Sequence, residues 1–242
     1  MKVEKYIAAN DETKSENLII EHVSHDLKGL IGQIGSLNEI LKNKLQSNDD
    51  SEIHQILVYI DSLCEQGNEI TNDLLETSEL ESHEDAPLER CSLDQLIIQQ
   101  AIIYKLQADK KQIIFQTIIP DKQFIFEINR SKFIRALDNL FSNALKFTGN
   151  QGQIKIILSD KEGKANIAVS DTGIGIPHEL QKEIFKKYSK ARRYGIQNEK
   201  CTGLGLYIVK KIIDLHKGKV WFSSEKNNGT TFYIELDNGT II

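Results

Sequence analysis

The spacing of apolar residues divides the chain into two halves with different periods. In the first half apolar residues recur every three or four positions, as on one face of a helix. A polar run at 47–51 interrupts this pattern and is typical of a turn. The pattern therefore predicts two long helices joined as an antiparallel hairpin. Their apolar seams are Ile19, Val23, Leu27, Leu30, Ile34, Leu37, Leu41 and Leu45, and then Ile53, Ile56, Ile60, Leu63, Gly67, Ile70 and Leu74.

A single hairpin leaves part of its apolar surface uncovered. Leu18, Ile31, Leu57 and Leu75 lie outside both seams. Pairing with a second copy of the chain would cover them and form a four-helix bundle. We therefore expect a homodimer.

The helical period stops in a polar segment at 81–87 that ends with Pro87. We place the domain boundary here, with an all-α dimerisation domain at 1–85 and a second domain at 86–242. Directly after it, Ser92 and Gln95 have the spacing of a capping box, which predicts a helix that runs to about Asp109.

In the second domain the period changes to that of strands. Alternating stretches occupy 112–119, 123–128, 153–159, 164–170, 218–224 and 230–236. Helical stretches occupy 130–147 and 203–216. This order predicts a two-layer α+β sandwich with a mixed sheet.

The predicted helix 130–147 has a polar stripe beside its apolar face. Asn139, Asn143 and Lys146 follow each other at helical spacing and therefore point the same way. Carboxamide oxygens are ligands that Mg²⁺ accepts, and an ammonium group suits a polyphosphate. Taken alone, the stripe is interpreted more simply as the solvated side of an amphipathic helix.

Two glycine-rich turns follow. Residues 171–177 come directly after a predicted strand, and residues 202–206 open a predicted helix. Glycine lets the backbone approach a ligand closely, and the free N–H groups at a helix start suit phosphate oxygens. Each turn alone is weak support for a site, since such turns are common.

Composition narrows the class of protein. A net charge of −5 argues against a nucleic-acid binder, and Cys64, Cys91 and Cys201 are too dispersed for a disulfide framework or a zinc site. No run approaches the length of a membrane span. We expect a cytoplasmic chain that contacts neither nucleic acid nor membrane itself; if it is a fragment, a membrane anchor would lie outside it.

Together these motifs resemble the core of a sensor histidine kinase of two-component systems. Residues 139–148 resemble its N box, 171–177 its G1 box, 184–188 its F box, 202–206 its G2 box and 229–232 its last glycine box. Residues 23–28 resemble the H box of the dimerising phosphoacceptor domain. The resemblance implies a catalytic domain with the sandwich fold shared with Hsp90-like ATPases.

The resemblance also implies roles for residues. Asn143 would be the main Mg²⁺ ligand with Asn139 beside it, and Lys146 would face the phosphates of ATP. Phe147 would lie against the adenine, and Asp171 would accept its amino group. The segment 189–201 would be a lid. The full set implied to contact the nucleotide is Asn139, Asn143, Lys146, Phe147, Asp171, Gly173, Gly175, Ile176, Phe185, Tyr188, Thr202, Gly203, Leu204, Gly205, Leu206 and Thr230.

The reaction implied is transfer of the γ-phosphoryl group of ATP to His25, with Asp26 taking the imidazole proton. The phosphoryl group would then pass to an Asp of a response-regulator receiver domain.

Four residues depart from the family pattern, one of them conservatively, since Phe147 replaces the frequent Tyr. Gly29 stands where the family has Thr or Asn, which puts phosphatase activity in doubt, Leu30 replaces a Pro, and Cys201 replaces a Gly. Two alternatives stay open: a non-catalytic dimeric scaffold that binds nucleotide, and an ATPase of the wider chaperone and topoisomerase type. The second depends on a Glu that activates water, where this chain has Asn139.

Overall fold

The computed structural model describes residues 27, 29–41, 45, 50–81, 87–188, 194–196, 199 and 201–242. Within it the chain divides into two compact units, Met1–Leu75 and Glu76–Ile242. The boundary expected at residues 85 and 86 stays a prediction, because most of the polar segment that carries it lies outside the described residues. Among the described residues, no helix is both long and apolar enough to span a bilayer.

The N-terminal unit is helical where it is described. Residues 29–41 form one helix, and α2 (Asp50–Glu81) forms the next. Leu30 and Ile56 of the two predicted seams are 2% and 9% exposed, respectively. The apolar residues outside the seams are exposed as expected, with Ile31 at 68%, Leu57 at 44% and Leu75 at 61%.

The predicted turn at 47–51 is too long. Helix α2 already begins at Asp50, inside that run. Asp and Ser are polar, but they are also residue types that helices favour at their N-terminal end. At its other end α2 continues past the predicted seam to Glu81.

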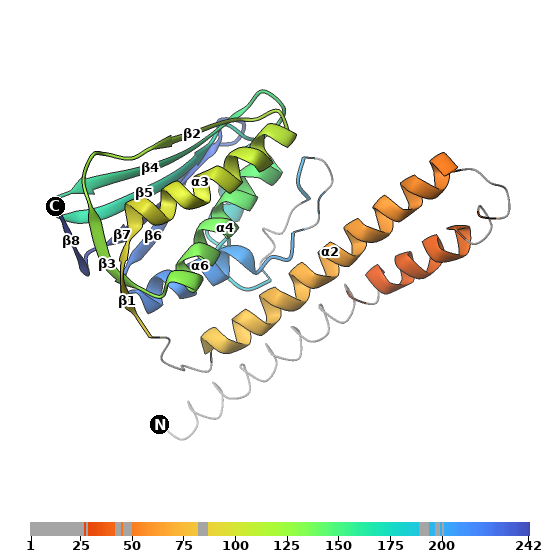
Figure 1. The fold of residues 1–242 in the computed structure, drawn as a ribbon, viewed down its shortest axis with the longest axis horizontal. Coiled ribbons are helices and arrows are strands. Elements are labelled where there is room, and N and C mark those ends of the chain that lie inside the picture. Colours follow the sequence, from red (N-terminus) through yellow and green to blue (C-terminus); the bar gives the residue numbers. More distant parts are fainter. Residues whose placement is uncertain are drawn as a thin grey trace, which may run out of the picture. The chain divides into compact units, whose positions relative to one another are not determined.

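The C-terminal unit is a sandwich in which α3, α4 and α6 lie on one face of a five-stranded sheet (Figure 1). The strands lie in the order β2-β4-β5-β7-β6. Strand β2 is parallel to β4 and the other neighbours are antiparallel, so the predicted mixed sheet is confirmed. The elements are α3 (Leu93–Lys110), β2 (Ile114–Ile118), α4 (Arg130–Phe147), β4 (Gln153–Lys161), β5 (Lys164–Asp171), α5 (His178–Gln181), α6 (Gly205–Leu215), β6 (Lys219–Ser224) and β7 (Thr230–Leu236).

A second, smaller sheet was not predicted. In it β3 (Phe124–Ile128) is flanked by β1 (Glu89–Ser92) and β8 (Gly239–Ile241), both antiparallel to it. Gln123 and Ile242 extend this pairing with two backbone hydrogen bonds of 2.9 Å. The predicted strand 123–128 therefore forms, but it belongs to this sheet and not to the large one.

The core lies between the helices and the large sheet. Phe133, Leu137 and Leu140 of α4 are at most 1% exposed, as are Ile208 and Ile212 of α6. Burying an aliphatic or aromatic side chain of this size contributes roughly 1.5–3 kcal/mol, so these residues fix which side of each helix faces the sheet. The polar side of α4 is thereby turned away from the sheet.

The opposite face of the large sheet carries an apolar row with one residue from each strand. The strand register places these residues side by side, and Trp221 stacks on Tyr233 with ring centroids 5.4 Å apart. Trp221 is 38% exposed. In order across the sheet the row is Ile118, Ile157, Ala168, Tyr233 and Trp221.

The capping box expected at the start of α3 does not form. Ser92 is the N-cap residue, but its side chain makes no cap bond to the helix backbone. Its hydroxyl instead donates to Asp94 Oδ1 at 2.7 Å, and the same oxygen accepts the Phe124 N–H at 2.9 Å. A contact with β3, 30 positions along the chain, thus replaces the local cap.

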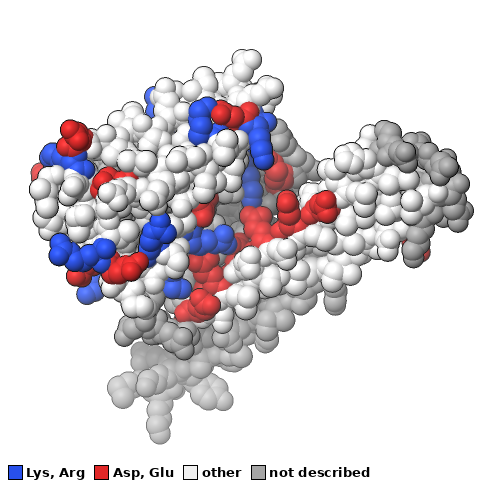
Figure 2. Space-filling view, in the orientation of Figure 1, with Lys and Arg blue, Asp and Glu red and all other residues white. Residues whose placement is uncertain are grey.

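The last turns of α2, residues 76–81, belong to the C-terminal unit and are bonded to it through carboxylates. Glu76 accepts from Arg135 Nε at 2.8 Å, and Glu81 accepts from the Tyr207 hydroxyl at 2.6 Å. Figure 2 shows that basic and acidic side chains lie next to one another over this unit. Several of them form ion pairs, such as Lys122 with Asp160 at 2.7 Å and Lys164 with Glu235 at 3.0 Å.

Candidate nucleotide site

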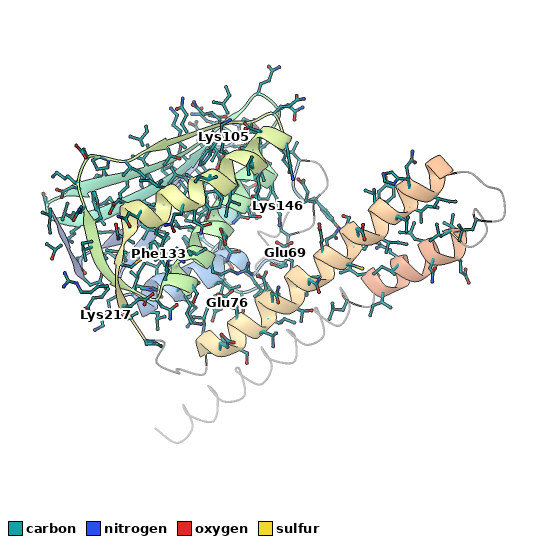
Figure 3. The ribbon with its side chains drawn as sticks, in the orientation of Figure 1. Glu69, Glu76, Lys105, Phe133, Lys146 and Lys217 are labelled. Carbon is teal, nitrogen blue, oxygen red and sulfur yellow. The ribbon has the colours of Figure 1, made fainter. Side chains whose placement is uncertain are left out.

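The C-terminal end of α4 is joined to three other segments. The last carbonyls of a helix have no partner within it, and here each of three in succession has one elsewhere. The Leu145 carbonyl lies 3.5 Å from Lys111 Nζ, the Lys146 carbonyl accepts the Ile196 N–H at 2.9 Å, and the Phe147 carbonyl accepts the Ile174 N–H at 3.1 Å. Figure 3 marks the two ends of α4 with Phe133 and Lys146. The predicted lid and the first glycine turn therefore meet where the polar stripe ends.

The first glycine turn fits this place only because Gly173 and Gly175 have no side chains. A Cβ on Gly173 would lie 2.1 Å from the Phe147 carbonyl oxygen. Gly175 has φ +64°, and a Cβ there would lie 1.9 Å from the Glu225 carbonyl oxygen. The Gly229 N–H also donates to the Gly173 carbonyl at 2.9 Å. The turn is thus held between α4 and the β6–β7 connection.

Asp171, at the end of β5, is a buried carboxylate with only 9% of its surface exposed. Its Oδ1 accepts the Gly173 N–H at 2.8 Å and the Thr230 N–H at 3.3 Å. Burial raises the pKa of Asp171 to about 6, although these two bonds act against it. Neither bond uses Oδ2, so this oxygen is left as an acceptor for a donor such as an exocyclic amine.

The second glycine turn brings the start of α6 to the polar stripe of α4. A Cβ on Gly205 would lie 3.0 Å from Asn139 Oδ1, so the absence of a side chain permits this approach. The N-cap residue Leu204 offers no side-chain bond to the first N–H groups of α6. Uncapped N–H groups and the positive end of the helix dipole form an anion-binding position.

Two buried polar atoms on α4 and just after it have no hydrogen-bond partner among the described residues. They are Asn139 Nδ2 and Thr148 Oγ1. Unpaired buried polar groups are costly unless a ligand or water completes them. Their position beside the start of α6 and the first glycine turn fits a polar ligand.

Asn139 and Asn143 carry side-chain oxygens of the kind that would fit a divalent cation bound through a nucleotide. The part of the chain that the structure describes has no cluster of three His, Cys, Asp or Glu residues that would hold a metal. A cation here would depend on the oxygens of Asn139 and Asn143 and on ligand phosphates, which is how Mg²⁺ is usually held at nucleotide sites.

Several predicted site residues support the site through packing. The ring of Phe185 meets those of Phe222 and Phe232 edge-on, at 5.9 and 6.4 Å. Leu204 is 1% exposed, and the Thr230 hydroxyl lies 2.8 Å from Ser224 Oγ. A direct contact of these side chains with a nucleotide stays a prediction. His25 and Asp26 lie outside the described residues.

Two residues that hold the first glycine turn were not predicted. Ser224 Oγ accepts the Ile176 N–H at 2.8 Å and donates to the Gly229 carbonyl at 3.0 Å. Gln181 Nε2 donates to the carbonyls of Ile176 and Ser224 at 2.9 and 3.0 Å. No motif marks either residue, because each also bonds a backbone group more than 40 positions away, which becomes a neighbour only in the fold.

Comparison with known proteins identifies this arrangement. The family of histidine kinase-, DNA gyrase B- and HSP90-like ATPases matches residues 128–240. The uncharacterized sensor-like histidine kinase ycf26 of Pyropia yezoensis is 32% identical over 91% of this chain, which spans about a third (36%) of that relative.

Solved structures agree. The catalytic domain of histidine kinase ThkA is 31% identical, with a TM-score of 0.56, over 63% of this chain and 99% of that domain. ThkA in complex with the response regulator TrrA is 26% identical, with a TM-score of 0.71, over 97% of this chain and 67% of that one. The expected histidine-kinase and Hsp90-like sandwich is thereby confirmed, and the chain belongs to the histidine kinase family.

Proposed function

We propose that this chain is a protein-histidine kinase that binds ATP with Mg²⁺, phosphorylates its own His25 and passes the phosphoryl group to an Asp of a response-regulator receiver domain. The observation that carries the proposal is the buried carboxylate of Asp171, held by two backbone N–H groups beside the end of α4. The uncapped start of α6 next to Asn139 supports it.

Asp171 selects the base. Adenine presents an amino group where guanine presents a carbonyl oxygen. A carboxylate accepts a hydrogen bond from the amino group and repels the carbonyl oxygen. The Gly173 and Thr230 N–H groups hold Oδ1 of the carboxylate in place. Oδ2 therefore has a fixed orientation in which it can accept from the base.

The phosphates lie between α4 and α6. The N–H groups at the start of α6 and the ammonium of Lys146 attract the phosphate oxygens. Asn143 and Asn139 hold the cation through their side-chain oxygens. When bound, Mg²⁺ neutralises the charge that develops on the phosphates during transfer.

His25 receives the phosphoryl group. A neutral imidazole nitrogen attacks the γ-phosphorus, the bond to the bridging oxygen of ADP breaks, and the proton of the imidazole passes to Asp26. The phosphorylated imidazole then donates the group to the receiver carboxylate. The structural neighbour ThkA was solved together with a response regulator, which supports a partner of this kind.

The N-terminal unit pairs with a second copy. Ile31, Leu57 and Leu75 are exposed, and a four-helix bundle formed by two hairpins would cover residues of this type. A homodimer is the state in which we expect the kinase to work.

Labelling with γ-³²P-ATP tests the proposal. The wild type should acquire acid-labile, base-stable phosphate, and His25→Gln should acquire none while its ATP affinity is retained. His22→Gln, three positions earlier in the sequence, is the matched control and should label normally.

Each other result points to a different function. Label retained by His25→Gln would mean that another residue is the acceptor. ATP hydrolysis by the wild type without labelling would favour the ATPase alternative, and ATP binding with neither reaction would favour the scaffold.

A further inference from the structure

Tyr104 of α3 holds one turn of α4 by two contacts. Its hydroxyl donates to Asp138 Oδ1 at 2.6 Å. Its ring stacks on Phe141, with centroids 4.1 Å apart and an interplanar angle of 14°. Tyr104 is 2% exposed, so its ring is shielded from water, and the hydrogen bond to Asp138 is partly buried. A polar and an apolar contact from one side chain thus reach the same turn of α4.

A third ring prevents this side chain from moving. Phe115 of β2 meets Tyr104 edge-on at 6.3 Å and Phe141 edge-on at 5.6 Å. Aromatic rings packed in this way have few alternative arrangements. The rings therefore restrict how α3 and α4 pack at this turn, and the hydrogen bond to Asp138 is the contact that depends on the Tyr104 hydroxyl.

The position of this turn on the helix gives the contact its importance. At about 100° per residue, Asp138 and Phe141 lie within about 60° of each other, and Asn139 and Asn143 lie within about 40°. The centres of the two pairs are about 150° apart around the axis. Tyr104 therefore holds α4 from the side nearly opposite to its polar stripe.

We propose that Tyr104 and Asp138 are a positioning pair, which fixes the rotation of α4 about its axis and so keeps Asn139 and Asn143 in place for the nucleotide-bound cation. This inference rests on the proposed function, because it assumes that a cation binds there. Neither residue touches the nucleotide.

A small rotation has a large effect at the cation. Turning α4 by about 20° moves an atom that lies about 6 Å from the helix axis by about 2 Å. Mg²⁺ requires near-octahedral ligands at about 2.0–2.1 Å and tolerates such a shift poorly. Binding of the base should tolerate the rotation better, because Asp171 belongs to β5 and does not turn with α4.

The test separates binding of the cation from binding of the base. A non-hydrolysable ATP analogue is titrated calorimetrically into the protein at a series of Mg²⁺ concentrations and in EDTA. Tyr104→Phe should raise the Mg²⁺ concentration needed for half-maximal tightening by about tenfold, the scale seen when a partner of a metal ligand is lost. Its affinity in EDTA should equal that of the wild type. If Tyr104→Phe does not fold, Asp138→Ala removes the same hydrogen bond and should give the same shift.

Two further variants separate the hydrogen bond from a general loosening of α3 and from the charge of Asp138. Ser92→Ala removes a hydrogen bond of 2.7 Å at the start of α3 and should leave the Mg²⁺ dependence unchanged. Asp138→Asn keeps an oxygen that accepts from Tyr104 but removes the charge, and should behave like the wild type. A loss in Asp138→Asn equal to that in Tyr104→Phe would overturn the positioning role, because the carboxylate would then act on the cation by its charge.

The remaining outcomes distinguish failure of the positioning pair from failure of the proposed kinase function. A lower melting temperature in Tyr104→Phe with an unchanged Mg²⁺ response would overturn the positioning pair alone. A wild type that binds no analogue, with or without Mg²⁺, would overturn the proposed function, and this inference with it.

Discussion

The two ends of α4 are completed in different ways. At the N-terminal end the Asn129 side chain accepts the Lys132 N–H at 3.0 Å, three residues away, and the Asn129 N–H donates to His216 Nε2 at 2.9 Å. At the C-terminal end the carbonyls of Leu145, Lys146 and Phe147 meet three segments that are distant in sequence. At the N-terminal end Asn129 combines a local cap with two tertiary bonds, since its Nδ2 also donates to the Pro87 carbonyl at 3.2 Å. At the C-terminal end three segments come together.

The N-terminal end of α4 thus has a structural role, whereas the C-terminal end belongs to the candidate site. A residue at the N-terminal end affects the free energy of unfolding through the cap of α4 and the bonds of Asn129 to His216 and Pro87. A residue at the C-terminal end affects several segments at once, and it lies beside the polar groups that we propose bind the nucleotide. Mutations at the first end should therefore change stability alone, and mutations at the second should change stability and binding together.

The largest effect is expected from Gly175→Ala. The new methyl group meets the Glu225 carbonyl oxygen at a backbone φ of +64°. We expect a loss of about 3 kcal/mol or more, a melting temperature lower by roughly 10 °C, and loss of ATP binding. Gly163→Ala is the matched control, since Gly163 has φ +80° but nothing within 4 Å of a Cβ. It should cost about 1 kcal/mol and leave binding intact, and equal losses in the two variants would refute the role of crowding.

Asp171→Asn should stabilise the protein while it harms recognition. Burial raises the pKa of Asp171 to about 6, so its contribution to stability is present below about pH 4 and is lost as the pH rises through about 6. At about pH 7.5 the neutral Asn should raise the free energy of unfolding by up to about 3 kcal/mol. Thermal melts should show this gain shrinking on acidification, and competition binding should show weaker preference for ATP over GTP. A variant that is no more stable than the wild type above neutral pH would contradict the buried charge.

Asn129→Ala should lower stability and nothing else. It removes the side-chain cap of α4, which costs about 1–2 kcal/mol. Chemical denaturation measures the loss, and calorimetry should find unchanged ATP affinity. Ser131→Ala, which removes only the hydroxyl that donates to Asn129 Oδ1, should cost less. Weaker ATP binding in Asn129→Ala would mean that the two ends are not independent.

The smallest effect is a pH dependence at His216. Burial lowers the pKa of this histidine, although its bonds to Ile212 and Asn129 act against the shift. The folded state prefers the neutral ring, so its contribution to stability is present above about pH 6.5 and is lost as the pH falls below it. The melting temperature should fall less on acidification in His216→Gln than in the wild type. His178→Gln, which changes an exposed histidine, should leave this fall unchanged. The measurement is best made in Asp171→Asn, because Asp171 acts with the opposite sign in the same range.

The sequence predicted those elements whose reasons are local. The predicted helix 130–147 is confirmed as Arg130–Phe147, because a strongly amphipathic run follows a residue that caps it. The predicted strand 230–236 is confirmed as Thr230–Leu236 for the analogous reason of strict alternation. Strands β1 and β8 were missed because three or four residues carry no period, and both depend on β3.

The candidate site divides in the same way. Asp171 and the glycines belong to sequence motifs, and these motifs predicted that they would form one site. Ser224, Gln181 and the Tyr104–Asp138 pair stand in none, since their partners lie at least five and up to 48 positions away. The role of His25 stays a prediction.

The open face of the large sheet gives the protein a spectroscopic label. Trp221 is the one tryptophan in the 242 residues, and it lies in the apolar row on the face opposite to the helices. Its fluorescence therefore reports unfolding of the C-terminal unit alone, whereas far-ultraviolet circular dichroism also senses the helices of the N-terminal unit. The two signals recorded in one melt would show whether the units unfold together or in turn, without any dye or added residue.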